Sequence, residues 1–308
     1  MLLNLPEFEY VSCETVEEAC SLLSTYNGDA RVFAGGTDML VKMKHRRATP
    51  RKLINIKKIK SLDYIDYDEA DGLRIGALTT IDSLARSTLV MRQFPILGQA
   101  AGVLGTPHVR NLATLGGNLC NASPAAECAP ALITMGAEAT LSGPEGRRTV
   151  PLEEFFTGPG RSVVRSDELL TEIRVPRQPA GTVGVHLKHG SRRVDVAVAG
   201  ASVLMTFDGE QCKDIKIALS SVGPTPLRAK EAESILKGET VNEEKRELID
   251  RAARTASAES RPIDDLRGRA GERRDIIESL VKEAINRLIS GRKKIISLDT
   301  FVGKKSRN

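Results

Sequence analysis

Two segments with adjacent glycines constrain the fold of this chain more than any other feature. The first is AGGTD at 34–38, after an expected strand, and the second is TLGGN at 114–118, about eighty residues later. Glycine lets the backbone approach a ligand closely, and successive amides at a helix start attract anions. One Gly-Gly turn is usually only a turn, whereas two such segments predict a site for a long ligand with phosphates, such as a diphosphate dinucleotide.

No standard nucleotide motif explains the two glycine segments, because both GxGxxG and GxxxxGK[ST] are absent. Ser123-Pro124 after the second segment predicts a helix that begins there, with Ser123 as N-cap and Pro124 as first residue. Glu127 would then lie in the first turn, where the helix dipole favours a carboxylate. It could instead accept hydrogen bonds from ribose hydroxyls, and both interpretations stay open.

The composition is that of an ordinary globular protein. The 308 residues are 41% hydrophobic and 28% charged, which is enough for a large core or two domains. Apolar runs are too short to cross a membrane, and the N-terminus lacks the basic and apolar regions of a signal peptide. A cytoplasmic chain with no integral membrane segment is therefore expected.

Cysteine and charge patterns exclude several classes of site. The five cysteines include no CxxC pair, which argues against a disulfide framework and against a metal site held by this chain alone. Basic residues concentrate at 42–60 and 292–307, but the net charge is only +5, and Trp is absent. Because aromatic stacking platforms are scarce, no nucleic-acid partner is expected. The basic stretches favour solvated surface and a face that docks a partner protein.

Hydrophobic periodicity and turn residues predict an α+β chain in two parts. Prolines 176 and 179, followed by Gly181, mark the boundary between them. The expected helices are 15–27 (N-cap Thr15), 80–90, 95–104, 242–258 and 272–290, and the expected strands are 30–34, 52–56, 73–78, several within 137–175, 183–189, 194–207 and 213–222.

At several points the sequence resembles a known family. AGGTD at 34–38, and TLGGN followed by NASPAAE within 114–127, resemble the two flavin-binding signatures of the FAD-binding subunits of molybdenum hydroxylases, the family of xanthine dehydrogenase and the carbon monoxide dehydrogenase medium subunit. The resemblance covers nearly the whole chain. It continues through ELLTEIRVP (168–176), HLKHGSRRVDVAVAGASV (186–203), SSVGPTPLRAKEAE (220–233) and PIDDLRGRAGERRDII (262–277).

The resemblance implies a fold and a division into domains. An FAD-binding domain of the vanillyl-alcohol-oxidase (PCMH) type is expected over 1–178, in subdomains of about 1–57 and 58–178. A smaller α+β domain of the CO-dehydrogenase-flavoprotein type, with an antiparallel sheet plus helices, would follow at 179–291. Residues 292–308 would form a basic tail.

The resemblance also implies a cofactor site without catalytic side chains or metal ligands. Glu127 stands where the family has an Asp near the cofactor, and Lys188 matches a lysine close to the flavin ring. Leu104 and Leu170 match positions that line the flavin or adenine. The pyrophosphate would be wrapped from one side by Val32, Phe33, Ala34, Gly35, Gly36, Thr37, Asp38 and Met39, and held, with the nearby flavin, from the other by Thr114, Leu115, Gly116, Gly117 and Asn118.

Four further residues have alternative interpretations. A cation at Lys188 would stabilise the negative charge that builds on the flavin during reduction, but Lys188 could also be an exposed strand lysine of a basic surface. His108 could hydrogen-bond a ligand, although a structural role is favoured. One branch of the family holds a four-iron cluster on four inserted cysteines. Only Cys120 and Cys128 occur here, so no cluster is expected, and Cys128 reads as a small buried hydrophobic residue.

These features predict the FAD-binding, electron-transfer subunit of a heterotrimeric molybdenum hydroxylase. A large subunit would oxidise the substrate on molybdopterin, and a small subunit would carry [2Fe–2S] clusters. The flavin would pass electrons to NAD⁺, a quinone or another carrier, in a dimer of heterotrimers. The chain alone would not act on the organic substrate. The alternatives are a subunit with a purely structural FAD and a stand-alone flavin reductase or oxidase of the same fold.

Overall fold

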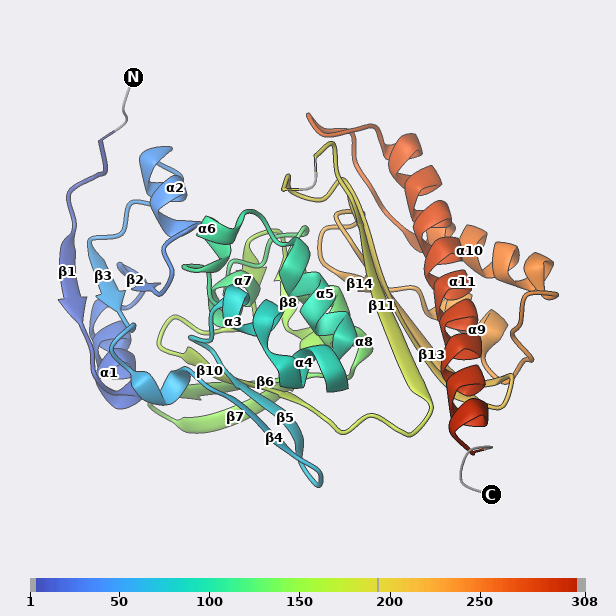
Figure 1. The fold of residues 1–308 in the computed structure, drawn as a ribbon. Coiled ribbons are helices and arrows are strands. Elements are labelled where there is room, and N and C mark those ends of the chain that lie inside the picture. The colour runs from blue at the N-terminus through green and yellow to red at the C-terminus, as the bar shows by residue number, and fades with distance from the viewer. Residues whose placement is uncertain (1–3, 193, 304–308) are drawn as a thin grey trace.

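The computed structural model describes residues 4–192 and 194–303, with side chains to residue 291. Its elements form three blocks that lie side by side (Figure 1). A small parallel sheet lies at the N-terminal end, a five-stranded sheet with short helices lies in the middle, and a four-stranded sheet backed by helices lies at the C-terminal end. The mixed helix-and-sheet fold predicted from the sequence is confirmed.

The first block is a parallel sheet of order β1-β3-β2 with α1 beside it. Helix α1 begins where the sequence predicts, because the Thr15 hydroxyl accepts a hydrogen bond from the amide of Glu18. Strand β2 ends at the first glycine segment, and α2 follows it. The bounds are β1 Glu9–Ser12, α1 Val16–Tyr26, β2 Ala30–Phe33, α2 Met39–Lys44 and β3 Lys52–Asn55.

The second block is an antiparallel sheet of order β4-β5-β10-β6-β7 covered by helices. The 3-10 helix η1 (Lys60–Leu62) leads into it. Its bounds are β4 Ile65–Asp68, β5 Gly72–Gly76, α3 Ile81–Arg86, α4 Thr88–Gln93, α5 Pro95–Val103, α6 Pro107–Arg110, α7 Leu115–Cys120, α8 Cys128–Thr134, β6 Glu138–Gly143, β7 Gly146–Pro151, η2 Leu152–Glu154, β8 Phe156–Gly158, β9 Arg161–Ser162 and β10 Leu169–Val175.

The third block is an antiparallel sheet of order β11-β12-β13-β14. Helix α5 packs on β11, and α8 packs on β12 and β13. Leu204 and Ala218 of this sheet belong to the same buried cluster as the middle block, so the two blocks share a core. The bounds are β11 Thr182–His189, β12 Ala199–Asp208, β13 Gln211–Ser220, β14 Leu227–Arg228, α9 Lys230–Leu236, α10 Arg246–Glu259 and α11 Ala270–Gly303.

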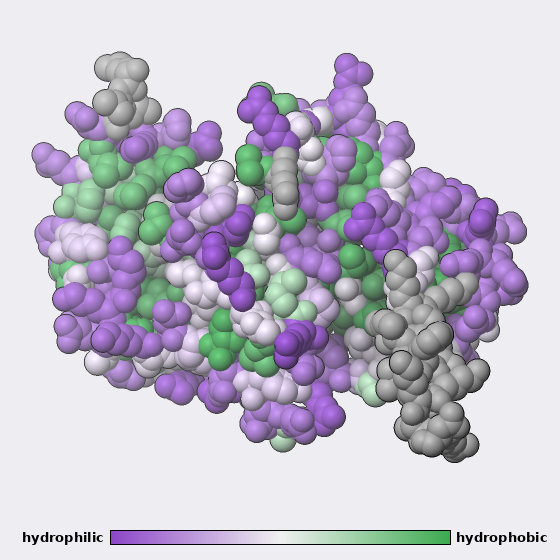
Figure 2. All heavy atoms as spheres, viewed as in Figure 1, coloured by the Kyte–Doolittle hydropathy of each residue, from purple (hydrophilic) through white to green (hydrophobic). Residues whose placement is uncertain are grey.

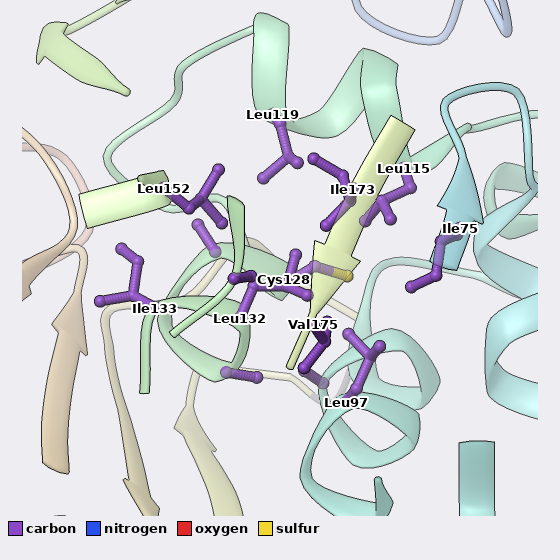
Figure 3. Close-up of a cluster of buried hydrophobic side chains, with 14 of the residues drawn as sticks. Ile75, Leu97, Leu115, Leu119, Cys128, Leu132, Ile133, Leu152, Ile173 and Val175 are labelled. Atoms are coloured by element: carbon purple, nitrogen blue, oxygen red, sulfur yellow. The ribbon is translucent and has the colours of Figure 1, made fainter. Parts of the chain in front are cut away.

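Cys128 lies in the core of the middle block. Its side chain is fully buried among apolar neighbours that include Leu132 and Val175 (Figure 3). Burial raises the pKa of the thiol well above its usual range, and the Glu127 carboxylate adds to the shift. The prediction that Cys128 is a small buried hydrophobic residue is confirmed.

One predicted helix is interrupted, and two predicted starts, of a helix and of a strand, are wrong. The helix at 80–90 is two helices, because Ser87 ends α3 and its hydroxyl caps α4 at Val90. Ser123 does not start a helix: its hydroxyl accepts from the Ala125 amide in a turn, and α8 begins at Cys128. The strand expected over 194–207 begins at Ala199, after a turn.

The surface of the first block and the C-terminal segment differ from the docking faces expected from the charge pattern. Figure 2 shows hydrophilic side chains over most of one face, with hydrophobic ones gathered over the first block. Tyr10 of β1 and Val41 of α2 are about half exposed in that block, at 51% and 53%. Helix α11 extends to Gly303, so most of the predicted basic tail is helical, and residues 304–308 lie outside the described residues.

Candidate functional site

The two glycine segments meet in the structure. A Cβ atom placed on Gly35 would lie 2.0 Å from the carbonyl oxygen of Leu112 and 3.0 Å from the Cα of Ala113, immediately before the second segment. Asn121, just beyond that segment, hydrogen-bonds Asp38 of the first. Only glycine at position 35 permits this approach, so the fold brings together two segments about eighty residues apart.

The first glycine segment presents unpaired backbone amides. The amides of Gly35, Gly36, Thr37 and Asp38 have no backbone acceptor within the described residues. Gly36 takes the left-handed conformation, at φ +74°, which turns the chain from β2 into α2. Loss of hydration raises the pKa of Asp38, and Lys42 and the hydrogen bond from Asn121 oppose that shift. Successive free amides at this turn suit an anionic group.

The second glycine segment uses its amides internally, which contradicts the expectation of exposed amides. Thr114 caps α7 and accepts hydrogen bonds from the amide of Gly117 to its hydroxyl and from the amide of Asn118 to its carbonyl. The amides of residues 115 and 116 donate to the carbonyls of Thr79 and Ala77 at the end of β5. This segment therefore does not supply an amide cradle.

The two glycines of the second segment have different surroundings. A Cβ atom on Gly116 would lie 2.8 Å from both the Cβ and the carbonyl oxygen of Ala77, so Gly116 is required for packing. A Cβ atom on Gly117 would meet only the Thr114 hydroxyl, at 2.9 Å, and otherwise open space. The side-chain oxygen of Asn118 is buried without a hydrogen-bond partner among the described residues. Gly117 and Asn118 thus leave room and an unused acceptor for a ligand.

Glu127 and Lys188 form a buried ion pair. Lys188 Nζ lies 3.1 Å from Glu127 Oε1, and both side chains are 6% exposed. His186 lies on the same face of β11, with Nε2 3.5 Å from Glu127 Oε2 and Nδ1 2.8 Å from the Ser202 hydroxyl. Gln99 of α5 accepts a hydrogen bond from the His186 amide. The interpretation of Lys188 as an exposed lysine is wrong.

The remaining sequence candidates differ in burial. Leu104 follows the last residue of α5 and packs, partly buried, against the central core. Leu170 of β10 is 3% exposed in the same core, which also contains the fully buried Leu115 of α7. His108 is exposed on α6, outside the core, so its favoured structural role has no support in packing.

Sequence reasoning missed Arg110 and His186. Arg110 Nη1 donates to the carbonyl oxygens of Leu104 and Gly105, at 3.3 and 3.2 Å. The alternation of a strand places residues 186 and 188 on one face, a signal that could have drawn attention to His186 beside Lys188. Nothing in the local pattern indicates that Arg110 donates to these two carbonyls, five and six residues earlier in the chain.

A family model described as the FAD binding domain in molybdopterin dehydrogenase matches residues 6–178. The chain belongs to the FAD-binding subunits of the molybdenum hydroxylases. A second model, the CO dehydrogenase flavoprotein C-terminal domain, matches residues 187–288 of this FAD-binding subunit. The resemblance drawn from the glycine segments is confirmed.

Relatives of this FAD-binding subunit match over most of its length. It is 37% identical over 281 residues to the carbon monoxide dehydrogenase medium chain of Hydrogenophaga pseudoflava, covering 91% of this chain and 96% of the relative. It is 30% identical over 283 residues to a xanthine dehydrogenase FAD-binding subunit of Escherichia coli, covering 91% and 96%. A solved carbon monoxide dehydrogenase from Hydrogenophaga pseudoflava, 36% identical, matches with a TM-score of 0.89 over 94% of this chain and 99% of that chain.

The residues of this FAD-binding subunit fit the FAD of its family. The free amides after β2 suit a diphosphate, and the space beside Gly117 admits close approach of a ligand. Within the described residues, no three His, Cys, Asp or Glu side chains gather as a metal site would require. None of the described helices combines the length and apolarity needed to cross a membrane.

Replacing Gly35 by alanine is expected to separate the two glycine segments. The new methyl group would overlap the carbonyl oxygen of Leu112, and overpacking against backbone costs on the order of 1–3 kcal/mol. We expect a lower free energy of unfolding in urea together with weaker FAD retention. Gly271→Ala is the matched control, because nothing lies within 4 Å of its added Cβ. Equal stability of the two variants would contradict the close approach.

Proposed function

We propose that this chain is the electron-transfer subunit of a molybdopterin-dependent hydroxylase. With FAD bound, the chain would take electrons from [2Fe–2S] clusters of a small partner subunit and pass them to NAD⁺, a quinone or another carrier. A large partner subunit would oxidise the substrate on molybdopterin. The observation that carries the proposal is the match, over 91% of this chain, to a carbon monoxide dehydrogenase medium chain.

We propose the FAD site at the junction of the glycine segments. Residues 32–39 would bind the diphosphate through the amides of 35–38, which have no backbone acceptor in the described part of the chain. Residues 114–118 would admit the cofactor at Gly117 and contact it through Asn118. Leu104, Glu127, Leu170 and Lys188 would surround the rings, with Leu170 contributing mainly backbone because it is buried in the core.

The cofactor and the protein would have different roles in this proposal. Bound FAD would supply the capacity to accept electrons one at a time, as [2Fe–2S] clusters deliver them, and to release them singly or as a pair, as NAD⁺ requires. The protein then needs no nucleophile or general base: its residues bind, orient and shield the rings. The domain limits of 1–178 and 179–291 belong to this proposal, and the family matches to 6–178 and 187–288 support them.

Reduction of the bound flavin by the partner subunit tests the proposal. The complex is purified with the subunits encoded beside this chain, and the small subunit is reduced photochemically under anaerobic conditions. We expect the flavin absorbance to bleach and to recover when an acceptor such as NAD⁺ or a quinone is added. Flavin that stays oxidised beside reduced clusters would contradict electron transfer and favour a structural FAD.

The same preparation separates the remaining alternatives. Sedimentation of the complex is expected to give the mass of two heterotrimers. A chain that purifies without partners and oxidises an organic substrate by itself would instead identify a stand-alone flavin oxidoreductase. The buried pair Glu127–Lys188 does not discriminate between these functions, because all three place FAD in the same site.

A further inference from the structure

Three successive carbonyl groups at the C-terminal end of α5 accept hydrogen bonds from two cationic side chains. Lys188 Nζ donates to the carbonyl of Val103 at 2.9 Å, and Arg110 Nη1 donates to the carbonyls of Leu104 and Gly105 at 3.3 and 3.2 Å. Residues 103–105 are here called the 103–105 turn. Lys188 comes from β11 of the third block and Arg110 from α6 of the second, so two separate parts of the fold hold the turn.

Both cations face a carboxylate and are largely shielded from water, but only Lys188 is closely paired. Lys188 is 6% exposed and lies 3.1 Å from Glu127, whereas Arg110 is 16% exposed, lies 3.9 Å from Asp82, and has a buried Nε without a hydrogen-bond partner among the described residues. A buried cation whose charge is balanced and whose hydrogen bonds are directed at backbone carbonyls is not free to move toward a ligand. Charge-assisted hydrogen bonds of this kind are stronger than neutral ones. The pairs therefore fix the position of the backbone they contact.

The 103–105 turn has little internal support of its own. Helix α5 ends at Val103, and the amide of Leu104 makes only a long terminal bond of 3.3 Å to Ala101. Gly105 takes the left-handed conformation, at φ +49°. Without the two cations, the orientation of the Leu104 side chain would depend on a short terminal turn.

We propose that Lys188 and Arg110 are positioning residues that clamp the 103–105 turn as one wall of the flavin site. Lys188 acts through the carbonyl of Val103, and not as a free cation held out to the flavin, because Glu127 balances its charge. This rests on the proposed site, in which Leu104 lines the flavin. Since Lys188 belongs to β11, packing of the third block against α5 becomes a condition for a formed flavin site.

A double-mutant cycle on FAD affinity tests the clamp. Lys188→Met alone would strand the buried Glu127 carboxylate, so Lys188→Met is always made together with Glu127→Gln and the pair is replaced as a unit. The full-length chain is freed of flavin, and FAD binding is followed by quenching of flavin fluorescence in the unchanged chain, in Lys188→Met/Glu127→Gln, in Arg110→Met and in the double variant that combines the two changes. Circular dichroism of each apo chain reports its thermal unfolding, and the fine structure of the bound flavin absorption band reports how firmly the ring is held.

We expect each single change to weaken FAD binding by about tenfold, the value of one lost charge-assisted hydrogen bond. The two together are expected to give about thirtyfold or less, because either loss already frees the turn. The flavin band should lose its fine structure while the thermal midpoint of the apo chain changes little between cycle members.

Arg86→Met is the matched control, because Arg86 pairs with the same Asp82 at 2.6 Å but contacts no carbonyl of the turn. Its FAD affinity is expected to equal that of the unchanged chain. Additive losses of about a hundredfold in the double variant, or an unchanged affinity in Arg110→Met, would overturn the clamp. Neither result bears on electron transfer, which the flavin-reduction experiment tests separately.

Discussion

Gly117→Leu is expected to abolish FAD retention while the chain still folds. The new side chain would fill the open space beside α7, where the cofactor needs to approach the backbone, and its Cβ atom would press only on the Thr114 hydroxyl. Rotating that hydroxyl away costs the helix cap, about 1 kcal/mol. A leucine side chain at the proposed contact between Gly117 and FAD should weaken FAD binding by at least about a hundredfold, or about 3 kcal/mol.

Two other glycine replacements make this expectation specific. Gly116→Leu should unfold the middle block, because its Cβ atom would collide with the backbone of Ala77. Gly271→Leu should change neither folding nor flavin content, since its added Cβ meets nothing within 4 Å. The measurement is the ratio of flavin to protein absorbance after gel filtration, with a urea unfolding curve for each variant. Normal flavin content in Gly117→Leu would remove residues 114–118 from the site.

The glycine segments could be recognised from the sequence because two of them occur in one chain, but the different use of their amides could not. Free amides at 35–38 and paired amides at 115–118 differ because the latter find acceptors at Thr79 and Ala77. Those acceptors lie at the end of β5, about forty residues earlier in the chain. The local sequence does not show which distant carbonyl will accept a hydrogen bond from a given amide. The two glycine segments therefore give the same prediction from sequence, and only the folded structure distinguishes them.

Serine residues account for the interrupted helix and for the wrong helix start in the same way. Thr15 caps α1 as predicted, and the Glu18 carboxylate supports that cap by accepting a hydrogen bond from the Glu14 amide. Ser87 interrupts a periodic apolar stretch, and Ser123 closes a turn after Ala122, which takes the left-handed conformation at φ +47°. In similar local sequences, a serine hydroxyl can cap a helix, interrupt it, or form a turn outside it. Tertiary packing decides which of these occurs.

Lys188→Met is expected to destabilise the chain by about 3–5 kcal/mol, the cost of stranding one partner of a buried ion pair. Glu127 is 4% exposed, and its second carboxylate oxygen already lacks a hydrogen-bond partner among the described residues. The methionine fills the volume of the lysine stem but cannot balance the charge. The measurement is the free energy of unfolding in urea, with FAD removed so that cofactor affinity does not contribute.

The double variant Lys188→Met/Glu127→Gln should recover most of that loss, because it removes the uncompensated charge together with its partner. Arg74→Met is a useful comparison, since Arg74 pairs with Glu172 at 2.7 Å but is 44% exposed, and the Tyr64 hydroxyl still donates to the Glu172 carboxylate when Arg74 is replaced. A pair whose cation is open to water contributes about 1 kcal/mol or less. If Lys188→Met is no more destabilising than Arg74→Met, or if the second substitution makes it worse, the pair between β11 and the residue before α8 does not hold these parts together.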